Sequence, residues 1–71
     1  MITLELLEEI KLKMLGLEVV HHLEGTDAYF KALEEVYNEY KNIFDAISKT
    51  GKNIVNCDLT ELLKKLKKMG Y

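Results

Sequence analysis

The chain of 71 residues contains no proline, tryptophan, glutamine or arginine, and it has a single cysteine, Cys57. One cysteine excludes a disulfide within the chain. The ten basic residues are all lysines, so the side chain that most often recognises guanine in DNA is missing.

Long apolar runs are also missing. No stretch approaches the roughly 18 apolar residues that span a bilayer. Glu5, Glu8 and Glu9 interrupt the apolar residues near the start, which is not the pattern of a signal peptide. The net charge of −2 offers no overall attraction to nucleic acid or to an anionic membrane. We therefore expect a soluble cytoplasmic protein without a membrane span.

The length predicts a single domain over residues 1–71. A core of this size supplies only about 3–5 kcal/mol of net stability, and small domains usually add disulfides, metals or oligomerisation. The hydrophobic content of 48% fits an unusually apolar core, oligomerisation, or both.

Two glycine-containing turns, at residues 24–27 and 50–53, divide the apolar periodicity into three helices. We expect helices at about 3–24, 27–50 and 58–69. Thr3, Thr26 or Asp27, and Asp58 are their candidate N-caps. The predicted fold class is all-α: a helical hairpin with a short third helix packed across it, resembling a three-helix bundle.

The segment 27–50 has the clearest pattern, an apolar face with charged residues opposite. Its regular helical spacing predicts that the aromatic residues belong to the core, and not to a surface that stacks on bases. The apolar residues are Tyr29, Phe30, Leu33, Val36, Tyr37, Tyr40, Ile43, Phe44 and Ile47.

The first segment has two apolar stripes, so one partner helix cannot cover it. We expect a second chain to cover one stripe, in a two-fold homodimer. One stripe holds Leu6, Leu7, Ile10, Met14, Leu17 and His21. The other, the predicted oligomer interface, holds Leu4, Leu12, Leu15, Val19 and Leu23.

A lysine cluster near the end of the chain is a candidate electrostatic binding site, formed by Lys64, Lys65, Lys67 and Lys68. It could bind phosphates, an anionic surface or an acidic partner. Lysines also interact favourably with the C-terminus of a helix, so a solvated helix face without a binding partner explains the cluster equally well. The preceding loop of about seven residues is too long for a helix-turn-helix, so nucleic acid is possible as a partner but not favoured.

Residues with metal-binding chemistry are sparse. Glu18 and His21 have the Glu-x-x-His spacing of di-iron bundles, but the facing stretch of the hairpin offers no inward carboxylates. The same pattern has an explanation without a metal, in which His21 is the polar edge of a core stripe and His22 is a solvated side chain. We therefore assign no metal ligand and no cofactor.

Two further motifs suggest chemistry only weakly. Cys57 precedes a helix N-terminus, where a thiolate is favoured, but neither histidine is near in sequence, and a half-buried structural thiol fits as well. Thr50-Gly51-Lys52 lacks the strand and the earlier glycine of a phosphate-binding loop, so it predicts a helix end.

We assign no catalytic residue and expect that the protein is not an enzyme. The predicted function is protein–protein interaction as a homo-oligomer, with an unidentified protein partner; the alternative is a small nucleic-acid-binding regulator.

Overall fold

The computed structural model describes residues 2–71, and this part of the chain contains helices and no strand. The helices are α1 (Leu4–Glu24), α2 (Thr26–Glu39), α3 (Lys41–Thr50) and α4 (Leu59–Lys68). The all-α prediction is confirmed, but the predicted number of helices was wrong, because residues 2–71 form four helices and not three. No helix among the described residues is long and apolar enough to cross a membrane.

The helix ends follow the predicted capping residues in two cases out of three. The Thr3 hydroxyl accepts a hydrogen bond from the Leu6 N–H at 3.2 Å, and the Asp58 carboxylate accepts one from the Thr60 N–H at 2.8 Å. The capping of α2 was predicted wrongly, because Thr26 and Asp27 lie inside the helix. Gly25, with φ +89°, occupies the N-cap position instead and makes no side-chain hydrogen bond.

The predicted helix over residues 27–50 is broken at Tyr40, whose φ of −120° and ψ of 31° leave the helical region. Helix α3 therefore takes a new direction and buries a different face. Ala46 and Thr50 are buried, although the single-helix pattern placed neither on the apolar face. The sequence contains neither proline nor glycine at the break, so the usual signals for a kink are missing.

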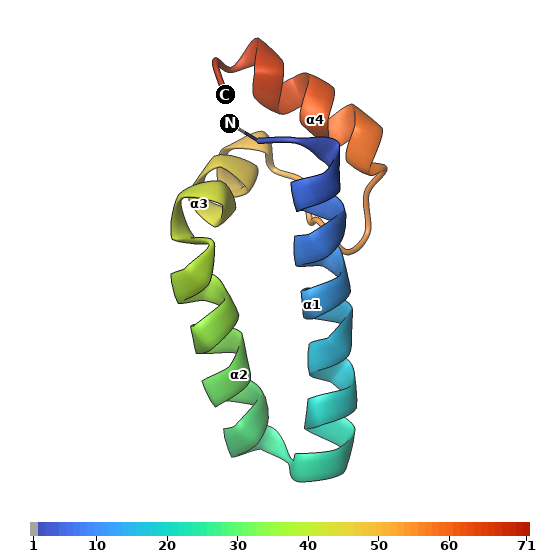
Figure 1. Ribbon diagram of the computed structural model, residues 1–71, viewed down its shortest axis with the longest axis vertical. Coiled ribbons are helices and arrows are strands. Elements are labelled where there is room, and N and C mark those ends of the chain that lie inside the picture. Colours follow the sequence, from blue (N-terminus) through green and yellow to red (C-terminus); the bar gives the residue numbers. More distant parts are fainter. Residues whose placement is uncertain (1) are drawn as a thin grey trace.

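The break allows α3 to pack with α4, which lies across the open end of the hairpin and contacts both α1 and α3 (Figure 1). The first and last described residues, Ile2 and Tyr71, lie beside each other there. We call this part, residues 2–13 and 40–71, the head. Its core combines the start of α1, α3, the 51–58 loop and α4; the buried residues are Ile2, Leu7, Ile10, Ala46, Ile47, Ile54, Leu62 and Leu66.

The remaining part, residues 14–39, is a bare pair of helices that we call the stem (Figure 1). Leu17 is its one buried residue, and no residue of α2 is buried. The prediction that the aromatic face of this segment forms a core was therefore wrong for the stem. Phe30 is 59% exposed and Tyr37 is 42% exposed, because no third element covers the two helices here.

Candidate interaction surface

The second stripe of α1 is the largest uncovered apolar feature of the helix. Leu12, Val19 and Leu23 are 70%, 56% and 78% exposed, and Leu15 is 40% exposed. Leu4, the fifth residue of the predicted interface, lies in the head and is half-buried. We therefore define the α1 stripe as Leu12, Leu15, Val19 and Leu23. Apolar residues grouped in this way mark interaction sites more often than single exposed residues do.

The stripe lies on the side of α1 opposite the residues that face the rest of the chain. At 100° per residue, its direction is roughly half a turn from that of Ile10 and Leu17, which are buried. Beside the stripe, Gly16 leaves open space, since a side chain there would meet no atom within 4 Å. Toward the head, a shallow depression joins Leu12 and Leu15 to Leu59 of α4.

A second apolar surface lies between the two helices of the stem. Two depressions share Met14, Tyr37 and Phe44, and one extends to Phe30 and the other to Ile54 in the head. The rings of Tyr37 and Phe44 stack at 5.7 Å across the helix break, and the Tyr37 hydroxyl donates to Asp45 at 3.2 Å. Sequence reasoning missed this groove, because the same residues were assigned to a buried core.

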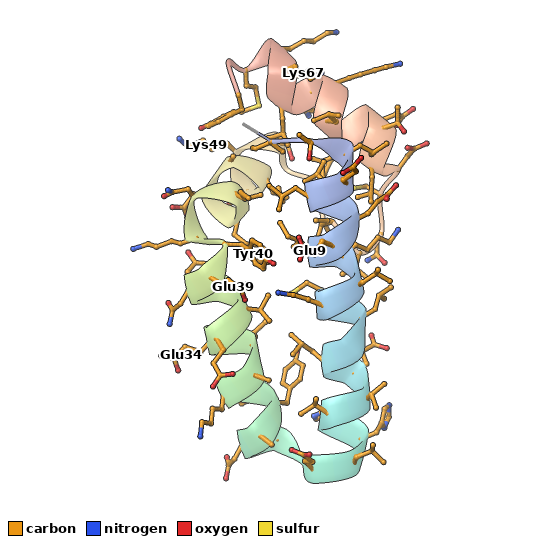
Figure 2. The ribbon with its side chains drawn as sticks, in the orientation of Figure 1. Glu9, Glu34, Glu39, Tyr40, Lys49 and Lys67 are labelled. Atoms are coloured by element: carbon orange, nitrogen blue, oxygen red, sulfur yellow. The ribbon has the colours of Figure 1, made fainter. Side chains whose placement is uncertain are left out.

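A polar contact joins the two helices at the boundary between head and stem. The Lys13 ammonium donates to the Tyr40 hydroxyl at 2.8 Å and to Glu39 at 3.1 Å. Figure 2 shows Glu39 and Tyr40 at the α2–α3 junction that faces α1. The hydrogen bond to Tyr40, followed by that to Glu39, raises the pKa of Lys13 above its ordinary value of 10.5. This contact holds Tyr40 toward α1 at the residue where the helix breaks.

The lysine cluster of α4 is exposed at the outer side of the head, where Figure 2 labels Lys67. One of its members is engaged, because Lys65 donates to the Thr50 carbonyl at 2.8 Å and closes the end of α3. Lys52 joins three of the cluster's lysines and Glu61 around one depression. Residues 49–71 hold six lysines and two acids, whereas residues 1–48 hold four lysines and ten acids. The part of the head from residue 49 onward is therefore basic, in a chain that is acidic overall.

The histidines of α1 lie at the closed end of the stem. Glu18, His21, His22, Glu24 and Asp27 are all exposed. The His21 ring meets the Tyr29 ring edge-on at 5.1 Å, so it packs against α2. Among residues 2–71, no group of three or more His, Cys, Asp or Glu side chains converges as a metal site.

Cys57 is a free, half-buried thiol that packs against the head core. It lies in the loop before α4, at the far end of the molecule from the histidines of α1 (Figure 1). Gly51, with φ +72°, ends α3 in the left-handed conformation. The Thr50-Gly51-Lys52 segment is thus a helix C-cap, as its pattern predicts.

The comparisons with known proteins do not add to these surfaces. No family model, no curated protein and no solved structure matches the chain. A function must therefore follow from the exposed stripe, the stem groove and the basic head themselves.

Proposed function

We propose that the protein is a small helical interaction module that self-associates through the α1 stripe and presents the assembled surface to another protein. The observation that carries this proposal is the exposure of the stripe, where Leu23 is 78% and Leu12 is 70% exposed. Burying apolar surface contributes about 25 cal/mol per Å². An oligomer that buries the stripe gains this free energy, whereas in a monomer the stripe stays exposed to water.

The small size of the chain supports the same proposal. A domain of about 70 residues has little stability to spare, and the stem buries only Leu17. Association adds stability by mass action to any folded state that binds a second copy. Self-association would therefore stabilise the part of the molecule that its own core does not reach.

A charge placed in the stripe tests the proposal. We expect Leu15→Glu to yield monomers by size-exclusion chromatography with light scattering, while the helical circular dichroism stays unchanged. Phe30→Glu is the matched control, because Phe30 is also exposed but belongs to the stem groove. If Phe30→Glu dissociates the protein and Leu15→Glu does not, the groove is the interface and the stripe is not. Leu17 is unsuitable for this test, because it is buried.

Nucleic-acid binding is the second candidate, and the arrangement of Lys52 with Lys64, Lys65 and Lys68 favours it. Phosphate contacts from lysines give binding that weakens steeply with salt. If this candidate is correct, we expect the protein to retain DNA or RNA at low salt. Replacement of Lys64, Lys65, Lys67 and Lys68 by alanine should abolish this retention. No retention at low salt removes the candidate.

A further inference from the structure

We infer that Leu12, Leu15 and Val19 of the α1 stripe are covered by the same three residues of a second copy, and that the two helices run antiparallel about a two-fold axis at Leu15. This inference rests on the proposed self-association. It adds the orientation of the two copies and the residues that meet.

The positions on α1 favour an axis at this residue. Leu15 lies near the middle of the Leu4–Glu24 helix, so two antiparallel copies centred on it overlap along nearly their whole length. The seam then places Leu15 against its own counterpart, and Leu12 beside Val19 of the second copy. Three exposed apolar positions per copy therefore enter one contact, with the self-complementarity that two-fold symmetry requires.

Charges on one flank of the stripe are complementary in this arrangement. Lys11 and Glu18 are about two turns apart and project from the same flank of α1. An antiparallel two-fold brings equal flanks together, so each Lys11 meets Glu18 of the second copy. The two residues cannot pair within one chain. They are seven positions apart, about 10 Å along the axis, and only side chains three or four positions apart meet on a helix.

The central line of the stripe supports the same orientation. Glu8 and His22 continue the heptad positions of Leu12, Leu15 and Val19. In a parallel pair each residue meets its own counterpart, so two Glu8 carboxylates would face each other in the seam. The antiparallel pair places Glu8 opposite His22 of the second copy, where an imidazole N–H can donate to the carboxylate.

The shape of the molecule agrees with the charges. The head is wider than the stem, because α3, α4 and the loop gather at one end (Figure 1). A parallel pair would bring two wide heads together beside α1. An antiparallel pair sets each head beside the slender stem of the other copy, so the helices can approach along their length.

Disulfide trapping tests the orientation directly. We would replace the native thiol by Cys57→Ser, and prepare Leu12→Cys and Val19→Cys as separate chains of different mass. Both positions are exposed, so the fold should tolerate the changes. The antiparallel seam predicts a cross-linked pair in the mixture and little cross-linking of either chain alone. Two copies of position 12 would be about 9 Å apart along the axis, beyond the roughly 7 Å that a disulfide spans between Cα atoms.

The opposite pattern would overturn the inference: each chain cross-links alone, as parallel helices require, while the mixture adds nothing. A dimer with this pattern still leaves the proposed function standing. A wild-type protein that sediments as a monomer at all concentrations defeats both proposals.

Charge reversal gives an independent test. Lys11→Glu and Glu18→Lys should each raise the dimer Kd several-fold, because like charges then meet at the flank. The double variant should restore the wild-type Kd, because the pair is only exchanged between copies. Glu34→Lys is the matched control, since Glu34 lies on α2 and points away from α1 (Figure 2). If the double variant still dimerises but does not recover the wild-type Kd, Lys11 does not pair with Glu18.

Discussion

The head and the stem are built from helices of similar apolar content, but the head buries eight apolar side chains and the stem buries one. In the head, α4 and the Ile54 loop cover α1 and α3, and Leu7, Ile10, Leu62 and Leu66 are fully buried. In the stem, two helices face each other without a third element, and Leu17 alone is buried. The difference shows that a short chain can concentrate its buried core at one end and leave apolar side chains uncovered at the other.

The largest expected effect separates the two regions by one substitution in each. Leu62→Ala removes a fully buried side chain of the head and should cost about 2–5 kcal/mol. That loss is comparable to the whole stability of a domain of this size. Leu23→Ala removes a side chain of the stem that is 78% exposed, and should leave the stability of the monomer nearly unchanged. Urea unfolding at low protein concentration checks both, and equal losses would contradict the division.

The stem should also open more easily than the head. Amide hydrogens of α2 should exchange faster than those of α4 at low protein concentration, because few buried contacts hold the stem closed. Raising the concentration should protect α1 selectively, since association stabilises the bound state by mass action. Hydrogen exchange with mass spectrometry measures both. Uniform protection at every concentration would remove the contrast between the regions.

Two glycines should respond to alanine in opposite directions. Gly51, with φ +72°, should lose about 1–2 kcal/mol in Gly51→Ala, because a Cβ disfavours the left-handed conformation. Gly16 lies inside α1 with open space around it, so Gly16→Ala should gain about 1 kcal/mol from helix propensity. Thermal unfolding of dilute protein gives the two signs. A loss in Gly16→Ala would mean that this position is already in contact with another surface.

The smallest expected effect concerns the contact between head and stem. Because the folded state raises the pKa of Lys13 above 10.5, its stabilising contribution is complete below that pH and is lost as the pH rises through the folded value. The difference in unfolding free energy between the wild type and Lys13→Met should thus be constant from about pH 6 to 9 and shrink above about pH 10. A difference that changes near pH 7 would contradict this assignment.

Much of the head follows from the sequence. The capping residues Thr3 and Asp58 and the left-handed Gly51 are local signals, and local hydrogen bonding decides their conformation. The break at Tyr40 was not predictable, because no proline or glycine marks it, and because Lys13, which donates to the Tyr40 hydroxyl, lies 27 residues away in sequence. Periodicity across the break is continuous, so the pattern alone favours one long helix.

The candidate site was predictable only in part. The two stripes of α1 can be recognised from helical spacing, and the structure leaves four of the five predicted interface residues exposed. The same spacing gave no warning that Phe30 and Tyr37 would be uncovered. A periodic apolar pattern shows that a face is suited to burial, but the pattern does not show which element covers that face.

The most direct test of the central claim, that the α1 stripe joins two copies, is sedimentation equilibrium of the wild-type protein over a range of concentrations. We expect the mass to rise from that of one chain, 8.2 kDa, to that of two, and Leu15→Glu to remain at the mass of one. A wild-type mass that stays at a single chain throughout would contradict the account.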